Sequence, residues 1–592
     1  MTGEKFYLIQ MKKIILAFVL LLSGNSVFSQ TKPETFCNPL NLDYRFVSSE
    51  PSHRTAADPV ITLYKNDYFL FASASGGYWY SPDLRDWTFV APEGLPLENP
   101  APAILILGDK MYYTAHRLKE VYETDNLKTG VWRKVADIDE YADPAFLLDD
   151  DERLYLYFGA SLDGGISVVE LDPKQNFKAV AKPVKLMNAN SAEHGWESSG
   201  EDNLGYIRSD VNRVEPYIEG SWMTKHNGTY YLQYSAPGTI WKTYADGVYT
   251  SKLPNKDFVY QLYSPFSYKP GGFIGSAGHA ATFQDKAGNY WRVATMVISV
   301  AHKFERRLGV FPAGFDAEGV MRTNTYLGDY PQFLPGVAKN PLDKNRTDWM
   351  LLSFGKRATA SSTLENRPAE NAFDEEIRTV WSARTGEKGE WLQVDLGSIS
   401  KINAVQINFA EQDAKAFGRA GKLFQQYTIE ISDDGKNWKM LVDKSKNQKD
   451  APHDYIEFSK AANARFLKLT NFRAASGKFA VRDLRVFGES NTPKPAEVKN
   501  FIVRRDEKDS RKSVLSWQPT ANATGYIVRF GISPKKLYNN YQVVRGNSLA
   551  MNGLNKNVDY YFSVDSINES GVTKGRKITG SNGKSSRNSI SR

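Results

Sequence analysis

The 592-residue sequence contains a single cysteine, Cys37, so no intrachain disulfide can stabilise the fold. Apolar residues rarely recur at helical spacing, which argues against an α-helical or α/β protein. After residue 22, no apolar run approaches the length of a membrane span. The net charge is +8, but the lysines and arginines are scattered singly and do not alternate with aromatic residues. This pattern argues against a nucleic-acid partner.

The N-terminus has the features of a secretory signal peptide, which we assign to residues 1–30. The basic pair Lys12-Lys13 precedes an apolar run, Ile14 to Leu22, and several small residues follow. Met11 is the expected true start. No lipobox precedes Cys37, which is expected to be a buried or half-buried thiol. The sequence therefore predicts a secreted or periplasmic protein that has no membrane span and is a monomer.

Short aromatic and β-branched runs are abundant, and aromatic residues make up 13% of the chain. Runs of this kind, broken by Gly, Asn and Asp, predict an all-β protein. A polar turn followed by an aromatic strand occurs five times, at 64–71, 107–113, 149–157, 225–234 and 284–292. Repeats at this spacing indicate a five-bladed β-propeller over residues 37–335. A large β-sandwich is the alternative.

Acidic residues recur at one position of this repeat. Ten or eleven residues before the aromatic strand stand Asp58, Asp143 and Glu219, and the fifth repeat has His279 there. The second repeat has only prolines and an alanine, and Glu215 falls outside the register. Because the innermost strand of each blade starts at the central channel, these four side chains are expected to converge there. Single Asp-Pro pairs are common in turns, but three acids in one register favour a functional site.

Converging carboxyl groups are suited to cleaving a glycosidic bond. One must be protonated and the other ionised, and a third carboxylate can separate their pKa values. The Ala-Asp-Pro contexts of Asp58 and Asp143 and the Ile-Glu-Gly context of Glu219 resemble glycoside hydrolase family 43. The resemblance implies an inverting enzyme with Asp58 as general base, Glu219 as general acid and Asp143 as pKa modulator. It implies no organic cofactor. Inversion requires Asp58 and Glu219 to stand about 6.5–9.5 Å apart.

The same resemblance suggests further site residues. His279 matches the channel histidine of the family, which lies near a bound calcium or a water cluster, so any ion there is expected to be held largely through water. Arg306, in preference to its neighbour Arg307, is expected to reach the substrate or an active-site acid. Trp79 and Trp222 are candidate sugar platforms, and packing within the blades is the alternative for both. The irregular loop 190–210 is expected to shape the pocket.

Two smaller domains follow a linker at 336–349. Residues 350–488 resemble a discoidin or F5/8 type C domain, a jelly-roll sandwich. The resemblance rests on Glu370-Asn-Ala-Phe-Asp374, Trp381-Ser-Ala and Glu390-Trp-Leu-Gln-Val-Asp-Leu-Gly397. Asp374 lies in the loop that carries calcium in many relatives, although Glu375-Glu376 departs from their pattern. After a linker at 489–495, residues 496–580 resemble a fibronectin type III sandwich, and 581–592 is expected to be a disordered tail.

The expected function is hydrolysis of plant-type polysaccharide or oligosaccharide, as an α-L-arabinofuranosidase or a β-D-xylosidase. The alternatives are a β-galactofuranosidase or galactanase, and a non-catalytic carbohydrate-binding propeller. An adhesion protein that uses the two C-terminal sandwiches is a further class. For an enzyme, removal of residues 350–592 is expected to leave hydrolysis of a small soluble substrate intact.

Overall fold

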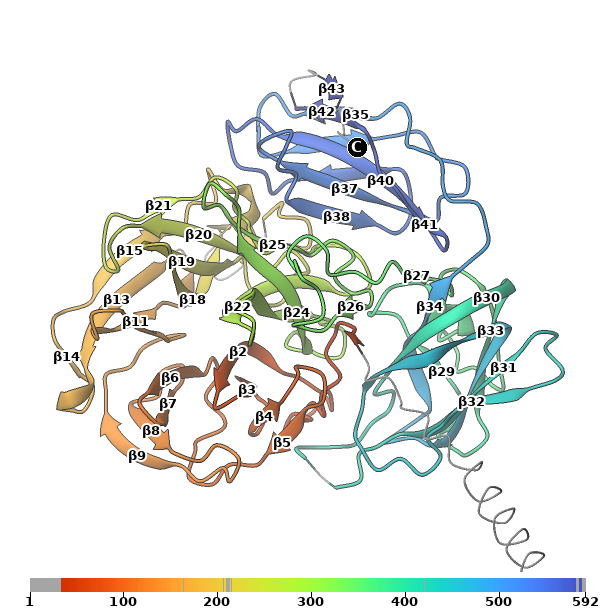
Figure 1. The fold of residues 1–592 in the computed structure, drawn as a ribbon, viewed down its shortest axis with the longest axis horizontal. Helices are drawn as coiled ribbons and strands as arrows, with labels where there is room; N and C mark the ends of the chain where they lie inside the picture. Colours follow the sequence, from red (N-terminus) through yellow and green to blue (C-terminus); the bar gives the residue numbers. More distant parts are fainter. Residues whose placement is uncertain are drawn as a thin grey trace, which may run out of the picture.

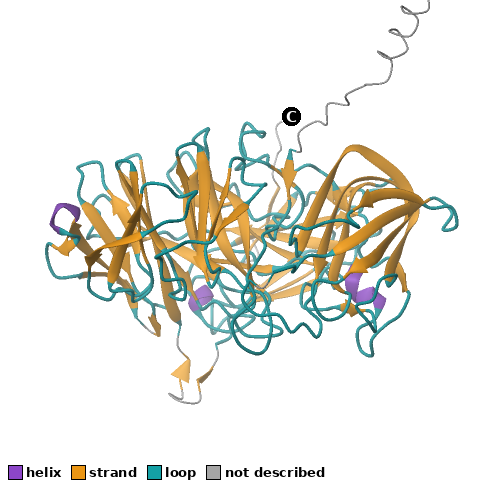
Figure 2. Ribbon diagram, turned by 90° about the horizontal axis from the view of Figure 1, so that it is seen from below, coloured by secondary structure: helices purple, strands orange, loops and turns teal. Residues whose placement is uncertain are grey.

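The computed structural model describes residues 34–162, 164–205, 207–208, 213–214, 216–419, 421–581 and 585–587. The predicted signal peptide, Glu215 and most of the predicted tail lie outside these residues. Figure 1 shows a propeller, coloured red to green, beside two β-sandwiches in cyan and blue. Strands dominate throughout (Figure 2), so the all-β prediction is confirmed. The helices in the described part are three short 3-10 turns: η1 (Pro173–Gln175), η2 (Gly195–Glu197) and η3 (Ala369–Phe373).

Five antiparallel sheets form the blades of the propeller, as the repeat predicts. The first two contain β2 (Ala57–Tyr64), β3 (Asp67–Ser73), β4 (Tyr78–Ser81) and β5 (Thr88–Val90), then β6 (Ala103–Leu107), β7 (Lys110–Thr114), β8 (Glu120–Thr124) and β9 (Arg133–Asp137). The third contains β10 (Ala145–Leu148), β11 (Leu154–Phe158), β13 (Gly165–Asp172), β14 (Lys178–Ala179) and β15 (Val184–Asn188).

The fourth blade contains β12 (Ser161–Leu162), β18 (Tyr217–His226), β19 (Thr229–Ala236), β20 (Ala245–Ser251) and β21 (Val259–Tyr260). The fifth contains β22 (Gly275–Gln284), β23 (Tyr290–Val297), β24 (Arg306–Phe315) and β25 (Met321–Thr323). A separate pair, β16 (Ile207–Arg208) and β17 (Arg213–Val214), precedes β18. Asn227 and Gly228 have φ of 48° and 67° in the β18–β19 turn, the left-handed values that a two-residue hairpin favours.

The ring is closed by the N-terminal segment. β1 (Thr35–Phe36) pairs with β26 (Gln332–Phe333), which follows the last blade. The side chain of Asn38 accepts from the backbone N–H of Val310 and donates to the carbonyl of the same residue. The Cys37 thiol is buried beside this segment, as predicted. Residues from both ends of the propeller sequence thus fix the fifth blade to the first.

The middle sandwich follows at residue 350. Its strands form one sheet network: β27 (Met350–Leu351), β28 (Arg357–Ala360), β29 (Trp381–Ser382), β30 (Trp391–Phe409), β31 (Gln426–Ser432), β32 (Lys439–Asp443), β33 (His453–Arg473) and β34 (Ala480–Glu489). Alternate residues of the long strand β30 are buried, for example Leu392, Val394 and Leu396. This period of two is what a strand with one core-facing side requires.

The C-terminal sandwich has two sheets. One contains β35 (Ile502–Arg505), β36 (Ser513–Ser516) and β39 (Ser548–Met551), and the other contains β37 (Gly525–Gly531), β38 (Asn539–Val543), β40 (Tyr561–Asn568), β41 (Gly571–Thr573), β42 (Lys577–Gly580) and β43 (Ser585–Arg587). The Tyr560 hydroxyl accepts from the backbone N–H of Asn555 five residues upstream, as the hydroxyl of a tyrosine corner does. The likeness to fibronectin type III stays a prediction.

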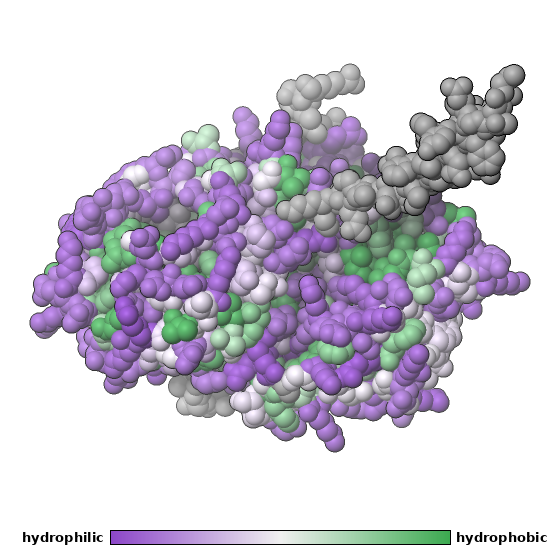
Figure 3. Space-filling model, turned by 60° about the horizontal axis from the view of Figure 1, so that its bottom comes forward, coloured by the Kyte–Doolittle hydropathy of each residue, from purple (hydrophilic) through white to green (hydrophobic). Residues whose placement is uncertain are grey.

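The three bodies share their hydrophobic cores. One cluster joins Tyr234 and Tyr268 of the propeller to Trp517 and Phe530 of the C-terminal sandwich. A second cluster, around Cys37, contains residues of all three bodies. The face shown in Figure 3 is mostly hydrophilic, with small apolar areas, as expected when the large apolar surfaces are packed between the bodies. No helix among the described residues is long and apolar enough to cross a membrane.

Buried charges also link the propeller to the middle sandwich. Arg307 of the propeller is fully buried, and its Nη2 lies 3.1 Å from Oε1 of Glu411. Glu305 is equally buried and lies 2.5 Å from Arg482. Removing one side of such pairs leaves unpaired charges in the interior, at roughly 3–5 kcal/mol each. Removal of residues 350–592 would expose Arg307 and Glu305 to solvent, and the expectation that hydrolysis of a small soluble substrate survives it stays a prediction.

Candidate active site

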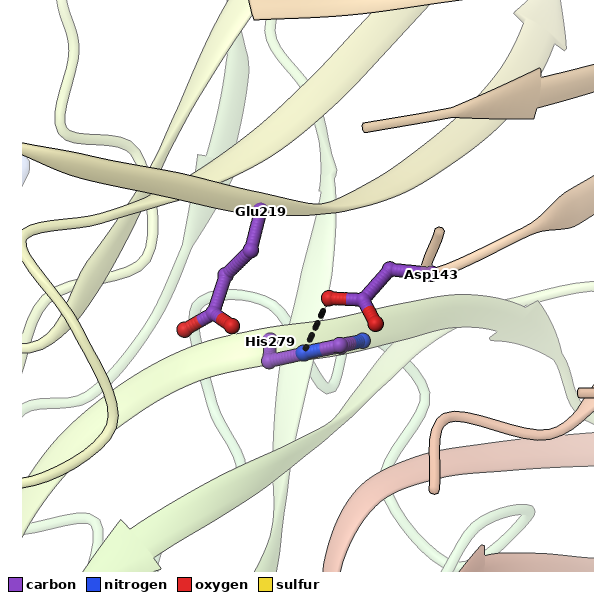
Figure 4. A group of neighbouring side chains, drawn as sticks. All are labelled: Asp143, Glu219 and His279. Atoms are coloured by element: carbon purple, nitrogen blue, oxygen red, sulfur yellow. Dashed lines mark ion pairs between the residues drawn. The ribbon is translucent and has the colours of Figure 1, made fainter. Parts of the chain in front are cut away.

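The structure brings together the four side chains that share the repeat register. His279 Nδ1 lies 3.1 Å from Asp58 Oδ1 and 3.8 Å from Asp143 Oδ2. Figure 4 shows Asp143, Glu219 and His279 pointing toward one another, from the bend before β10, from β18 and from β22. Ligand atoms of these three lie within 4.8 Å of one another. All four side chains are largely buried, so their charges interact through a medium of low polarity.

A left-handed backbone turn aims these side chains. Asp58, Asp143 and His279 have φ of 51°, 47° and 38°, values that cost a non-glycine residue of order 1 kcal/mol or more. Ala101, at the same place in the second blade, has φ of 50° without offering an acid. The turn is thus common to the repeats, and the residue type at this position decides whether a blade supplies an ionisable side chain to the site.

In the fourth blade, a glycine adopts the left-handed backbone conformation. Gly220, which follows Glu219, has φ of +62°, and a Cβ there would stand 2.8 Å from Cγ of His279 and 2.6 Å from Oγ of Ser235. The β18–β19 register shifts between Glu219 and Trp222. This bulge re-aims Glu219 and lets the imidazole lie against the backbone.

Asp58 is held as a carboxylate. Burial raises its pKa, but His279 and Arg306 outweigh burial, with help from a hydrogen bond that Ser73 donates, so the pKa lies below its ordinary value. The Ser73 hydroxyl lies 2.6 Å from Asp58 Oδ2, and Arg306 Nη1 lies 3.9 Å from Oδ1. The backbone N–H of Asp58 donates to Thr295 Oγ1 at 2.9 Å. This environment keeps Asp58 ionised and fixed.

Glu219 is held as a carboxylic acid. Burial raises its pKa most, Asp143 and Asp58 raise it further, and His279 and a Tyr244 hydrogen bond oppose them; the result is a pKa of about 8. The Tyr244 hydroxyl lies 2.5 Å from Glu219 Oε1. Asp58 and Glu219 therefore have opposite protonation states at neutral pH, although both are buried carboxyl groups of one site.

His279 is oriented from behind by a buried polar network. Its backbone N–H faces Ser235 Oγ at 2.9 Å and Asp246 Oδ1 at 3.1 Å. Asp246 is fully buried and pairs with Arg292, which is also fully buried. Burial lowers the pKa of His279, but the surrounding acids Asp58 and Asp143 outweigh this and raise it. The acids around His279 accordingly favour the protonated form of its imidazole.

Asp143 has a second histidine beside it. His116 Nδ1 lies 2.5 Å from Asp143 Oδ1, and the Ser221 hydroxyl donates to the Asp143 carbonyl at 3.1 Å. His116 and Tyr244 were not predicted from the sequence. Other hydrogen-bonding partners of the site do share a sequence position. Ser73, Ser235 and Thr295 all stand near the end of the second strand of a blade, opposite its first strand, so the sequence could have indicated them.

Comparison with known proteins identifies the propeller. The model "Glycosyl hydrolases family 43" matches residues 52–321, and "F5/8 type C domain" matches residues 357–483. The chain therefore contains a glycosyl hydrolases family 43 domain, followed by an F5/8 type C domain. A "Xylosidase/arabinosidase" of Bacteroides ovatus is 27% identical over 192 residues, which are 30% of this chain and 55% of that protein. The chain thus spans about half the length of this curated relative.

Two of the solved structures that match this chain do so at low identity and low TM-score. A "Glycoside hydrolase" has 16% identity and a TM-score of 0.42, covering 73% of this chain and 97% of its own. The GH43 BlXynB protein from Bacillus licheniformis has 16% identity and a TM-score of 0.39, covering 76% and 98%.

Arg306 and Arg307 have different surroundings in the family 43 domain. Arg306 reaches the site, with Nη1 3.1 Å from Thr239 Oγ1 and 3.9 Å from Asp58 Oδ1. Arg307 points away, and its Nε lies 2.7 Å from His453 Nε2 of the F5/8 type C domain. Adjacent strand residues face opposite sides, which explains why only Arg306 reaches the acids. Phe304 stacks near the Arg306 guanidinium and is 38% exposed.

The two predicted sugar platforms are embedded in packing. Trp79 is 1% exposed, and its indole N–H donates to Asp43 at 2.5 Å. The prediction that it stacks on sugar is corrected, because no face of its ring is free. Trp222 is half-buried against the first-blade core, and its N–H donates to the Thr282 carbonyl at 3.1 Å. A stacking role for Trp222 stays a prediction.

The Asp374 carboxylate of the F5/8 type C domain already has hydrogen-bond partners, and calcium there stays a prediction. This carboxylate accepts from the Thr379 hydroxyl at 2.9 Å and from the Glu376 N–H at 3.2 Å. The adjacent Glu375 pairs instead with Arg485 at 2.7 Å. Among the described residues, three potential metal-binding side chains gather only at Asp143, Glu219 and His279. Calcium needs six to eight oxygen ligands, and Asp374 offers one carboxylate that is already engaged.

The loop at 190–205 has a structural role that the sequence did not indicate. Its backbone bonds to the C-terminal sandwich, as between Gly195 N–H and the Leu554 carbonyl at 3.1 Å. His194 and Tyr234 both contact the fully buried Glu197. The loop therefore docks the sandwich. That the loop 190–210 shapes the pocket stays a prediction, and its residues 206, 209 and 210 lie outside the described residues.

Proposed function

We propose that the chain is an inverting glycoside hydrolase that cleaves O-glycosidic bonds at the channel of its family 43 domain. The observation that carries this proposal is the opposite shift of two neighbouring carboxyl groups. The pKa of Asp58 is lowered, despite burial, by His279 and Arg306, whereas burial and Asp143 raise that of Glu219 to about 8. Single-displacement glycoside hydrolysis requires one ionised and one protonated carboxyl group.

In the proposed reaction, Glu219 gives its proton to the glycosidic oxygen as the bond to the anomeric carbon breaks. A water molecule attacks that carbon from the opposite face, and Asp58 takes a proton from this water. The products are a sugar with inverted configuration and an alcohol. Glu219 is then ionised and Asp58 protonated, and proton exchange with solvent restores both groups before the next turnover. Asp143 acts as pKa modulator, since its charge disfavours ionisation of Glu219.

Arg306 and His279 lie beside Asp58 and are the proposed substrate-binding residues. Both are cationic donors in a buried site, and such donors can hold sugar hydroxyl groups while they keep Asp58 ionised. For the substrate, we favour α-L-arabinofuranosides or β-D-xylosides. The name of the Bacteroides ovatus relative, "Xylosidase/arabinosidase", supports this choice.

The proposed reaction does not involve calcium. The group Asp143, Glu219 and His279 offers two carboxyls and one nitrogen, whereas calcium prefers oxygen ligands alone. Direct coordination would also compete with the proton that Glu219 must carry. A hydrated ion held beside His279 through water stays a prediction. We also propose, from the N-terminal sequence, that the protein is secreted or periplasmic.

The test measures hydrolysis of nitrophenyl α-L-arabinofuranoside, β-D-xyloside and β-D-galactofuranoside, together with oligosaccharides of the same sugars. Asp58→Asn should lower kcat/KM by roughly 10²–10⁴ on every substrate. Glu219→Gln should cause a similar loss on oligosaccharides and a smaller loss on nitrophenyl glycosides, because nitrophenolate leaves without a proton.

Proton NMR of the first product should show the inverted anomer. Retained hydrolysis in both variants, or a first product of unchanged configuration, would overturn the assignment of acid and base. Asp150→Asn is the matched control, since this side chain is 86% exposed and belongs to the third blade segment without facing the channel.

A further inference from the structure

A cavity of about 280 Å³ lies where the family 43 domain, the F5/8 type C domain and the C-terminal sandwich meet. Lys242, Gly271 and Val297 line it from the propeller, Arg378 from the F5/8 type C domain, and Tyr541 from the C-terminal sandwich. Domain junctions are preferred places for ligands, and small-molecule pockets usually measure about 300–1,000 Å³. At about 280 Å³, this cavity is slightly smaller than that range, which suits a single sugar unit.

Close packing fixes the walls of the cavity. A Cβ on Gly271 would stand 2.4 Å from the carbonyl oxygen of Gln542 and 2.9 Å from the Tyr541 ring. A Cβ on Gly275 would stand 2.8 Å from Cβ of Lys242. Gly271 therefore allows the C-terminal sandwich to approach the loop before β22, and Gly275 allows the Lys242 segment to approach the start of β22. Walls held in this way present a preformed surface, which lowers the entropic cost of binding.

Of the polar groups at the cavity, some are paired with protein groups and others have no partner among the described residues. Arg378 Nη2 lies 3.0 Å from Glu201 Oε1, and the backbone N–H of Lys242 faces Glu201 Oε2 at 3.3 Å. Burial, with Glu201 and Asp202, raises the pKa of Tyr541 to about 12, so its hydroxyl stays a donor. In the described part of the chain, no partner engages this hydroxyl or the Lys242 ammonium. An aromatic ring with free donors suits the apolar face and hydroxyl groups of a sugar.

The cavity adjoins the strands that carry the catalytic groups. β22 starts at the cavity with Gly275 and reaches His279 four residues later. Val297 pairs with Gly275 on one side and with Arg306 on the other. One strand spacing, about 5 Å, thus separates the backbone of Arg306 from Val297 of the cavity wall, and two spacings, about 10 Å, separate it from Gly275. Lys242 likewise stands two residues before Tyr244, which bonds to Glu219.

We propose that this three-domain cavity is a distal subsite that binds one sugar unit of a longer glycan while another unit occupies the Asp58–Glu219 centre. The proposal rests on the proposed glycosidase function. It gives both C-terminal domains a part in substrate selection, because each supplies one wall. A short glycoside would not reach the cavity, so the subsite would favour oligosaccharides over single-sugar substrates.

The test compares Tyr541→Ala and Lys242→Met with the unmodified protein on a nitrophenyl glycoside and on an oligosaccharide of four to six units of the same sugar. Each variant should lower kcat/KM on the oligosaccharide about tenfold, in line with the loss of one stacking or hydrogen-bonding anchor. Tyr541→Phe, which keeps the ring, should retain most of the stacking contribution. Melting temperatures report whether Tyr541→Ala is folded, and Lys242→Met preserves the wall if it is not.

Calorimetry provides a readout that does not need turnover. Oligosaccharide binding to Glu219→Gln should weaken about tenfold when Tyr541→Ala or Lys242→Met is added. Equal loss on both substrates, or unchanged oligosaccharide binding in both double variants, would overturn the subsite. If the unmodified protein hydrolyses none of the glycosides but its oligosaccharide binding still depends on Tyr541 and Lys242, the glycosidase proposal fails while the cavity remains a glycan site.

Discussion

Removing the charge of Asp143 tests the electrostatic design of the centre most directly. The pKa of Glu219 rises from its ordinary 4.5 to about 8, first through burial and second through Asp143. At about 1.4 kcal/mol for each pH unit, this rise corresponds to about 5 kcal/mol in favour of the protonated form. Because burial is the largest cause, we expect Asp143 to supply less than half, roughly one to one and a half pH units.

Asp143→Asn should therefore lower the pKa of Glu219 to about 6.5–7. The change removes a like charge while it keeps the side chain's size, and Glu219 must be protonated to act as general acid. The alkaline limb of the kcat/KM profile should move down by about one pH unit, measured on an oligosaccharide whose leaving group needs a proton. The acid limb, which reports Asp58, should move little.

An alkaline limb that stays in place, or moves upward, would contradict this reasoning if the variant retains the unfolding profile of the unmodified protein. Asp150→Asn supplies the comparison, since it also removes one carboxylate from the third blade segment but on an exposed side chain. Its pH profile should match that of the unmodified protein.

Three further predictions concern stability and geometry. Glu219→Gln should be more stable than the unmodified protein at pH 8.5 but not at pH 4.5. The pKa of Glu219 is raised to about 8 in the folded state, so the unmodified protein loses stability as the pH rises from 4.5 to about 8, and the glutamine does not. Urea unfolding should show the stability difference between the two proteins growing by roughly 2–5 kcal/mol over this range, and a constant difference would refute the buried acid. Gly278→Ala should lower kcat with little change in KM, since a Cβ there would stand 2.7 Å from the Tyr244 ring that contacts Glu219; full activity in this variant would show that Tyr244 does not support the acid. Glu411→Ala should destabilise the chain by roughly 3 kcal/mol in urea unfolding, because it removes a partner of the buried Arg307, whereas a loss below 0.5 kcal/mol would indicate that the domain interface is not coupled to folding.

The sequence repeat alone predicts much of the fold. Alternation of polar turns and aromatic strands predicted five blades, and the sheets contain those strands. The register of Asp58, Asp143, Glu219 and His279 also followed from sequence, because equivalent positions in repeated units face the same axis. Trp79 shows the limit of such reasoning. An indole ring can serve as a sugar platform or pack in a core, and only the 1% exposure of Trp79 in the structure decides between these roles.

The sequence by itself determined the blades, the recurring acids and the order of the domains, because strand periodicity and turn chemistry are local properties. The tertiary structure alone decided that Tyr244 and His116 contact the acids, that Arg306 and not Arg307 reaches Asp58, and that three domains enclose one cavity. Burial and opposite charge separate the pKa values of Asp58 and Glu219. Both depend on residues distant in the chain, so no local pattern could assign acid and base.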